Sequence, residues 1–315
     1  MKVISYSLIS RFMDRWNIIP HCPFNIYEVH LTNNVRFEPN LPMIYGSYFE
    51  SKVLGTTANK MAVIDLPRKE LTAKQKRENI IRLAEGKEPI KGEKRIDHIR
   101  IDQQVETAFQ VAKKYGMTIV EGHNTQVRIF KRIPNSDWIL RGTLDLFPTP
   151  ISLNVEHPVT GKKTNIALID LKLTGDLDRM ISTKTIWNVG ATINFTQLFV
   201  YAYLLQDVDF ELNDRINPGN NLREIITPFI QTLAENYLIL LYYWVFEYKN
   251  PALRNTLKET MFTPLAKKEI EELIRKAIVE LSAMEESGYP TMPSYVVCKD
   301  CPISDCTVRE TIERV

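Results

Sequence analysis

The fold of this chain is decided by residues 141–147 (RGTLDLF) and 165–175 (NIALIDLKLTG). Both stretches carry the period-2 alternation of a strand, whose side chains point to opposite faces in turn. Asp170 and Lys172 therefore share one face of the second strand, and Asp145 lies on one face of the first. If the two strands are neighbours, these three side chains come together. Two carboxylates beside an ammonium suit a hard divalent cation and can stabilise charge on a phosphate.

An Asp-x-Lys pair alone is a weak signal, because such a pair on an exposed strand is usually an ordinary surface ion pair. Three independent features favour a site instead. A Gly-x-x-Asp motif from Gly142 to Asp145 lies one strand upstream. Gln197 and Tyr201 lie four residues apart on the following predicted helix, so they share one of its faces. Glu50, on a predicted helix near the N-terminus, could supply a third carboxylate.

The rest of the chain predicts helices around a central sheet. β-Branched and aromatic residues predict strands at 117–133, 137–147, 165–174 and 236–248, with a proline-punctuated loop at 148–164. Helical spacing predicts helices at 5–30 (broken around Pro20 to Pro23), 41–64, 101–115, 190–206 and 263–287. This order of elements indicates an α/β fold.

Composition narrows the class of protein. The chain has 315 residues, of which 44% are hydrophobic and 25% charged, so disordered, collagen-like and coiled-coil classes are excluded. The net charge of +2 argues neither for nor against a nucleic-acid partner. The first residues do not resemble a signal peptide, and the longest apolar run, 237–246, is too short to cross a bilayer. We therefore expect a cytoplasmic protein with no membrane partner.

Residues 68–100 have a different composition, with 11 Lys and Arg against 6 Asp and Glu and few large apolar residues. Such a charge run is usually the solvated surface of a helical insertion. A DNA-contacting arm is the alternative, and the sequence favours it less.

The four cysteines are distributed unevenly, with Cys22 near the start and Cys298, Cys301 and Cys306 near the end. In a reducing cytosol, metal binding is a better expectation than disulfides. Cys22 alone would be read as a buried structural cysteine. The C-x2-C-x4-C spacing of the other three makes chance burial a poor explanation. Four thiolates suit either zinc or a [4Fe–4S] cluster, and their chemistry does not separate the two.

The motifs GTLD (142–145), IDLK (169–172) and QLFVY (197–201), in this order, resemble the RecB-type branch of the PD-(D/E)xK nuclease superfamily. HCPFNIY (21–27) and CKDCPISDC (298–306) resemble the four-cysteine frame of the iron–sulfur nucleases in that branch, such as CRISPR-adaptation nucleases and AddB-like nuclease domains. The resemblance implies a restriction-endonuclease-like mixed central sheet flanked by helices. It also implies a helical iron–sulfur subdomain formed by both termini.

The resemblance divides the chain into a cluster-binding subdomain of residues 1–40 and 262–315 and a nuclease core of residues 41–261. The core carries a basic helical insertion at about 65–100. The four cysteines would ligate the [4Fe–4S] cluster, with zinc as the less favoured occupant.

The resemblance also assigns roles to single residues. Many members of the branch carry His at the first motif, where this chain has Glu50. Mg²⁺ or Mn²⁺ would be held by Glu50, Asp145, Asp170 and the carbonyl of Leu171. Lys172 would orient and help deprotonate the attacking water or stabilise charge on the phosphate. The nucleic-acid strand would be contacted by Gln197, Tyr201, Arg141 and Thr174.

These expectations amount to a metal-dependent DNA nuclease that hydrolyses phosphodiester bonds, as an exonuclease on single strands or DNA ends. Its partners would be DNA and proteins of recombination, repair or CRISPR adaptation. One alternative is a non-catalytic DNA-end-binding or adaptation-complex subunit of the same fold, against which the intact set of Glu50, Asp145, Asp170 and Lys172 argues. A zinc-stapled scaffold without nuclease activity is a further alternative.

Overall fold

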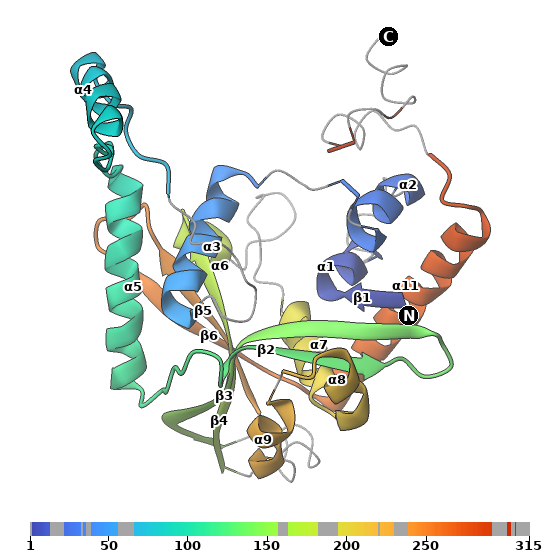
Figure 1. Ribbon diagram of the computed structural model, residues 1–315. Coiled ribbons are helices and arrows are strands. Elements are labelled where there is room, and N and C mark those ends of the chain that lie inside the picture. The colour runs from blue at the N-terminus through green and yellow to red at the C-terminus, as the bar shows by residue number, and fades with distance from the viewer. Residues whose placement is uncertain are drawn as a thin grey trace.

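The computed structural model describes residues 2–12, 22–32, 34–35, 39–55, 66–156, 163–181, 195–219, 221–229, 239–291, 301–303 and 306. Within these residues the chain forms a mixed sheet flanked by helices (Figure 1). The sheet has six strands in the order β1-β3-β4-β5-β6, and β2 pairs with β3 off this path. The strands are β1 Lys2–Ser5, β2 Thr125–Arg132, β3 Trp138–Glu156, β4 Lys163–Thr174, β5 Leu240–Glu247 and β6 Asn255–Met261.

Strand β3 is the longest of these strands, and it changes partners along its length. Its first residues pair parallel with β1, from Lys2↔Trp138 to Ser5↔Arg141, and antiparallel with β2. Its later residues pair antiparallel with β4, beginning at Leu146↔Ile169. Strand β4 then pairs parallel with β5, and β5 antiparallel with β6. Because β3 changes partners, it separates from β4 next to Asp145.

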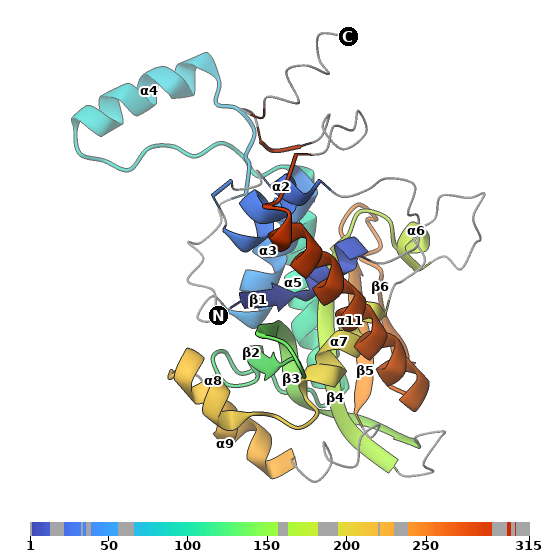
Figure 2. The same cartoon turned by 90° about the vertical axis from the view of Figure 1, so that its right-hand side faces the viewer.

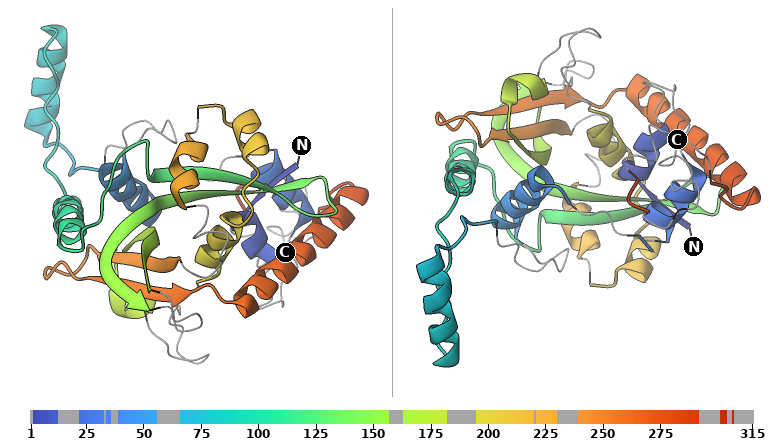
Figure 3. Two further views of the ribbon diagram at one scale, coloured as in Figure 1. Left: turned by 90° about the horizontal axis from the view of Figure 1, so that it is seen from below. Right: turned by 90° about the horizontal axis from the view of Figure 1, so that it is seen from above.

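Helices cover both faces of the sheet (Figure 3). Helices α3 (Leu41–Leu54) and α5 (Ile96–Lys114) share one hydrophobic cluster with Trp244 and Phe246 of β5. Helices α7 (Thr196–Leu204) and α11 (Pro264–Glu286) share the other cluster with Tyr243 of β5. Every residue of β5 is buried, as expected for an inner strand covered on both faces.

The remaining helices are short or stand apart. They are α1 Tyr6–Ile9, α2 Pro23–Asn25, α4 Ala73–Ala84, α6 Leu177–Ile181, α8 Phe210–Ile216 and α9 Leu222–Ile226, with single turns at Ser10–Phe12, Ile26–Leu31 and Thr227–Phe229. Helix α4 projects away from the body of the molecule (Figures 1 and 2). In the described part of the chain, no helix combines the length and apolarity needed to cross a membrane.

The two ends of the chain approach each other. Lys2 Nζ lies 2.6 Å from Glu285 Oε2, and the rings of Tyr27 and Tyr289 lie 4.7 Å apart. Residues of α1 and α11 also belong to the same hydrophobic cluster as α7. The division into units 1–40 plus 262–315 and 41–261 stays a prediction.

Several predicted elements differ from the structure. Residues 2–5 form strand β1 and residues 255–261 form strand β6, neither of which was expected. The predicted loop at 148–164 is wrong over residues 148–156, because β3 continues to Glu156. Register shifts on both sides of Thr149 and Pro150 let the strand accommodate its prolines.

The helix predicted at 41–64 ends at Leu54, followed by Gly55 with φ 87°, and residues 56–65 lie outside the described residues. The strand predicted at 117–133 begins only at Thr125. The central expectation of a mixed α/β sheet flanked by helices is confirmed.

Candidate active site

Asp145 occupies the point where β3 and β4 separate. Pairing of these strands begins at Leu146↔Ile169. The backbone amide of Leu171, two residues further along β4, therefore lies where the pairing has stopped. That amide donates a hydrogen bond to Asp145 Oδ2 at 2.9 Å. The carboxylate thus replaces the backbone acceptor that a continued ladder would provide, and this bond fixes Asp145 beside β4.

Asp170 and Lys172 lie beside it on β4. Asp170 is 1% exposed and forms an ion pair with the ammonium of Lys172, whose side chain is 29% exposed. The ring of Tyr243, which neighbours Asp170 on β5, lies 5.5 Å from Lys172 Nζ. The strand alternation that places Asp170 and Lys172 on one face therefore brings them together in the folded chain.

Glu50 reaches the same region from α3. The side chain of Asn40 caps this helix by accepting a hydrogen bond from the Met43 amide, and its packed residues include Phe49 and Val53. Burial raises the pKa of Glu50 to about 7, with Lys172 lowering it and Asp170 raising it. Glu50 therefore lies close enough to Lys172 and Asp170 for their charges to shift its pKa.

The site carries an excess of negative charge. Burial raises the pKa of Asp145 well above its usual value, and Asp170 and Glu50 raise it further. Burial also raises the pKa of Asp170, which the ammonium of Lys172 opposes. Burial disfavours the charged form of Lys172, but Asp170 and Asp145 more than compensate and raise its pKa. Among the described residues, the ammonium of Lys172 is thus the positive charge that acts on all three carboxylates.

The donor set fits Mg²⁺ or Mn²⁺ in its chemistry. Three carboxylates are hard oxygen ligands, and a divalent cation would neutralise the charge that Lys172 leaves uncompensated. As the side chains stand, no group of three His, Cys, Asp or Glu residues within the described ranges is arranged to hold a metal ion. Carboxylates repel one another, so they approach to the distances of metal ligands only when a cation offsets their charge.

Helix α7 supplies Gln197 and Tyr201. Gln197 Nε2 donates to the hydroxyl of Tyr201 at 2.8 Å. Burial raises the pKa of Tyr201, and the charges of Asp170 and Asp145 add to the effect. The helix lies against β3 at Gly142, where an added Cβ would come within 2.4 Å of Leu204 Cδ1. The glycine of the Gly-x-x-Asp motif therefore lets α7 pack close to the carboxylates.

Two further predicted contact residues lie at the edges of this region. Arg141 is exposed on β3, and partial burial and the neighbouring charge of Arg128 lower its pKa. Thr174 Oγ1 donates to the Asp176 carbonyl at 3.1 Å and accepts from the Asp176 amide at 3.2 Å. Thr174 thus closes a turn after β4. Nucleic-acid contacts by Arg141, Thr174, Gln197 and Tyr201, and metal binding by the Leu171 carbonyl, stay predictions.

Tyr243 lies in the strand predicted at 236–248 and is not among the predicted site residues. The residue is buried, at 3% exposed, yet its ring lies near the Lys172 ammonium and stacks against Phe195 with centroids 5.5 Å apart. A tyrosine within a run of aromatic strand residues carries no signal for such a position. Only the pairing of β4 with β5 reveals it.

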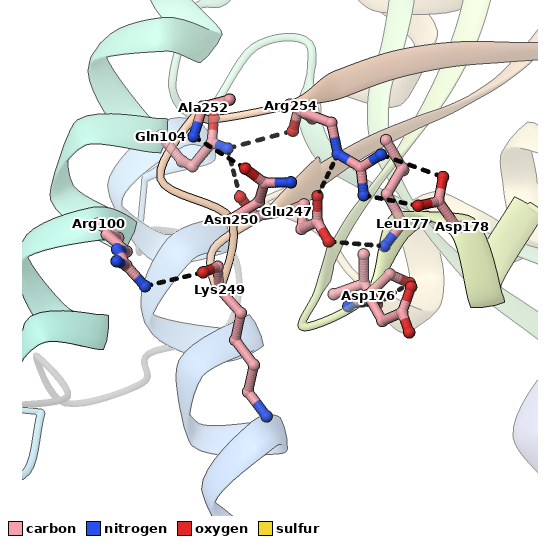
Figure 4. A network of polar contacts seen from close by, with 11 residues as sticks. Arg100, Gln104, Asp176, Leu177, Asp178, Glu247, Lys249, Asn250, Ala252 and Arg254 are labelled. Carbon is pink, nitrogen blue, oxygen red and sulfur yellow. Dashed lines mark hydrogen bonds and ion pairs between the residues drawn. The ribbon is translucent and has the colours of Figure 1, made fainter.

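A second polar network, which the sequence did not indicate, anchors the chain after β4 (Figure 4). Glu247 Oε1 accepts from the Leu177 amide at 3.1 Å, and its Oε2 accepts from Arg254 Nε at 2.7 Å. Arg254 also pairs with Asp178 through two contacts of 3.1 and 3.0 Å. Gln104 Nε2 donates to the carbonyls of Glu247 at 2.6 Å and Arg254 at 3.2 Å. The network ties the start of α6 to the β5–β6 hairpin and to α5.

Three of the four cysteines fall within the described residues. Cys22 is buried at the start of α2, and Asn25 of that helix donates from Nδ2 to Cys301 Sγ at 3.2 Å. Cys306 is partly exposed, and Cys298 lies outside the described residues. The segments that carry Cys22 and Cys301 therefore adjoin, and a four-cysteine cluster stays a prediction.

Comparisons with known proteins bear on the fold. No family model matches the chain, and no curated protein does. Among solved structures, the crystal structure of a protein from Eubacterium rectale described as a "putative exonuclease" matches with a TM-score of 0.51 and 14% identity. The match covers 96% of this chain and 88% of that one. The chain therefore shares the fold of that protein over nearly its whole length.

Proposed function

We propose that this protein is a metal-dependent nuclease that hydrolyses phosphodiester bonds of DNA. The observation that carries the proposal is the gathering of Glu50, Asp145 and Asp170 around Lys172 where β3 and β4 separate. A surface ion pair would not place one buried and two half-buried carboxylates against one described cation, because the uncompensated charge costs stability. The fold shared with a protein described as an exonuclease supports the same class of reaction.

In this proposal, Asp145, Asp170 and Glu50 would hold one or two Mg²⁺ or Mn²⁺ ions, and the Leu171 carbonyl would be a further ligand. A bound ion would supply an activated water and would neutralise charge that develops on the phosphate oxygens. The ammonium of Lys172, held near these carboxylates, orients the attacking water or stabilises the phosphate charge. Tyr201, with its hydroxyl bonded to Gln197, positions the strand.

The preferred substrates are single strands or free DNA ends. The comparison structure is described as an exonuclease, and this is the support for ends over internal sites. We further propose that Cys22, Cys298, Cys301 and Cys306 bind a [4Fe–4S] cluster that joins the two ends of the chain. The purified protein should then be brown, absorb near ~400 nm and contain iron. A colourless protein with stoichiometric zinc would replace the cluster with a zinc site.

Digestion of end-labelled DNA tests the nuclease proposal. Single-stranded, double-stranded and circular DNA are incubated with Mg²⁺, Mn²⁺ or EDTA, with 5′ and 3′ labels compared for polarity. Asp170→Asn and Lys172→Gln should each reduce cleavage by roughly 10³-fold, because each removes a group that stabilises the transition state. Asp137→Asn, which neutralises an exposed carboxylate outside the site, should cleave normally. Circular dichroism should show that all variants fold.

Undiminished cleavage in both site variants would overturn the site assignment. Absence of cleavage in the folded, metal-supplied protein, together with tight binding to DNA ends, would favour the non-catalytic subunit.

A further inference from the structure

Residues 66–95 form a hairpin-like projection, which we name the basic arm (Figures 1 and 2). Its outgoing half contains α4, which begins with a capping box between Thr72 and Gln75. Its returning half is tied to α4 by the side chain of Asn79. That side chain donates to the Ile90 carbonyl at 2.9 Å and accepts from the Ile90 amide at 2.6 Å. The arm is therefore braced within itself.

The arm is not covered by the rest of the protein. No residue of α4 is buried, and even Ile80, Ile81 and Leu83 are 70%, 58% and 61% exposed. An isolated helix of 12 residues is only marginally stable in water, so the cap and the bonds to Ile90 are needed to hold it. Bracing of this kind presents the exposed helix α4 to a partner.

Positive charge is concentrated on this surface. The arm has ten Lys and Arg against five Asp and Glu, a net charge of +5, whereas the complete chain has a net charge of +2. The remainder of the chain is thus net negative, at −3. Some arm cations are neutralised, as in the Lys69–Glu93 pair at 2.9 Å and the Lys87–Glu85 pair at 2.8 Å.

Other cationic side chains of the arm are exposed and not paired with a described carboxylate. Lys74, Lys76 and Arg77 are exposed on α4, and none of them forms an ion pair with another described residue. They lie on the first turns of a helix about 18 Å long. Lys74 and Arg77 are three residues apart and share one face.

The root of the arm is fixed to α5, and α5 is bonded to the helix that carries Glu50. Lys94 Nζ lies 2.5 Å from Asp102 Oδ2 on α5. The hydroxyl of Tyr48 on α3 donates to the other oxygen of Asp102 at 2.7 Å. Tyr48 precedes Glu50 by two residues, so the arm has a defined position relative to the candidate active site.

We propose that the basic arm binds the phosphate backbone of the DNA substrate at a distance from the bond that is cleaved. This inference rests on the proposed nuclease function, because that function supplies the polyanion that a +5 surface complements. Each Lys or Arg placed on a phosphate releases condensed counterions, which gives affinity without base sequence preference. The arm therefore sets affinity for long substrates and takes no part in chemistry.

The exposed aliphatic residues give a matched control. A protein partner would cover Ile80 and Ile81, whereas phosphate contacts do not need them. Substituting either set with Gln keeps a good helix former at each position and separates the two kinds of partner.

Binding is measured by fluorescence anisotropy of labelled duplex DNA with a single-stranded overhang, at salt concentrations from about 50 to 300 mM. All proteins are full-length and carry Asp170→Asn to prevent cleavage. The arm variant adds Lys74→Gln, Lys76→Gln and Arg77→Gln. One control adds Ile80→Gln and Ile81→Gln, and a second removes equal charge elsewhere with Lys113→Gln, Lys114→Gln and Lys268→Gln.

The arm variant alone should raise Kd by about tenfold to a hundredfold near ~0.1 M salt. Its slope of log affinity against log salt should be smaller by about 2–3, because each lost phosphate contact removes roughly 0.9. An unchanged Kd and slope would overturn the proposal. Equal weakening by the second control would also overturn it, since total charge would then explain the effect. Weakening by the isoleucine control would replace phosphate binding with an apolar contact.

Cleavage assays with Asp170 restored separate this inference from the function on which it rests. The arm variant should raise KM for long DNA and leave kcat unchanged. Cleavage with unaltered KM would reject the arm's part and leave the nuclease proposal intact. DNA binding that depends on the arm, in a protein that never cleaves, would reject the nuclease proposal and keep the arm as a DNA-binding element.

Discussion

Two groups of acidic side chains, one around Glu247 at the end of β5 and one around Asp170 on β4, differ in how their charge is balanced. At the β5–β6 hairpin, the buried Glu247 receives the Leu177 amide on one oxygen and Arg254 on the other, and Asp178 also pairs with Arg254. Where β3 and β4 separate, Lys172 is the cation of the described residues that acts on Asp145, Asp170 and Glu50. Glu247 raises the pKa of Arg254, whereas burial raises the pKa of every site carboxylate.

This difference distinguishes carboxylates that stabilise the fold from carboxylates that suit a functional site. A buried carboxylate with a full set of donors helps to hold α6, α5 and the β5–β6 hairpin together. Buried carboxylates with too few donors destabilise the protein and leave a negative potential that a divalent cation can neutralise. Active sites are commonly the places where such a cost is retained.

The largest effect is expected from Asp145→Asn. Asparagine keeps an oxygen that can accept the Leu171 amide but removes a charged metal ligand, so cleavage should fall on the order of 10³-fold. Without metal at pH 8, the free energy of unfolding should rise, because charge repulsion with Asp170 and Glu50 is relieved. Urea denaturation in EDTA and DNA digestion measure the two effects. A variant that loses activity and also loses metal-free stability would contradict the comparison.

The pH dependence of stability should also separate the two regions. Glu50 has a pKa of about 7 in the folded protein against 4.5 for an ordinary glutamate, so the folded state holds a proton that the unfolded state has released. Metal-free stability from this group is complete below about pH 4.5 and is lost as the pH rises to about 7. The loss amounts to at most about 3 kcal/mol.

Urea denaturation between pH 5 and 8, with and without Mg²⁺, measures this loss. Glu50→Gln should flatten the metal-free profile, and Mg²⁺ should restore stability at pH 8 in the unmodified protein. If the free energy of unfolding of the metal-free, unmodified protein does not change with pH, then ionisation of the site carboxylates does not destabilise the fold.

Glu247→Ala should lower the free energy of unfolding, whereas Asp145→Asn should raise it in the absence of metal. Glu247→Ala leaves the buried Leu177 amide without its acceptor, at a cost of about 1–3 kcal/mol. Glu247→Gln retains an oxygen for that amide and should cost less. Mg²⁺ should not restore the stability of either variant in urea denaturation. Recovery on adding Mg²⁺ would mean that Glu247 belongs to the metal site.

The smallest effect is expected from Gln104→Met, which removes one donor shared by the Glu247 and Arg254 carbonyls. The buried side chain keeps its size, so the cost should be about 1 kcal/mol, measured by urea denaturation. Cleavage should be unchanged, because Gln104 contacts the hairpin and not the carboxylates. A tenfold loss of cleavage would show that the network also positions β4.

The sequence predicted the parts of the fold whose signals are local. The alternation in residues 165–174 correctly indicated strand β4, and the spacing of residues 263–287 correctly indicated helix α11. Strand β1 was missed because four residues carry too little pattern, and its partner lies on β3, more than 130 residues away. Strand β6 was missed because its NTLKETM sequence is polar and only half-buried at the sheet edge.

The alternation of residues 165–174 is enough to place Asp170 and Lys172 on one face of a strand, because side-chain direction is fixed by the backbone of a few residues. The apolar residues on both faces of β5 are likewise enough to indicate an inner strand. The point where β3 leaves β4, and the described cations that meet each carboxylate, depend on packing of the whole chain. That packing places Arg254 on Glu247 and Lys172 on Asp170. Strand pairing and charge balance join residues far apart in the chain, and no local pattern encodes their meeting.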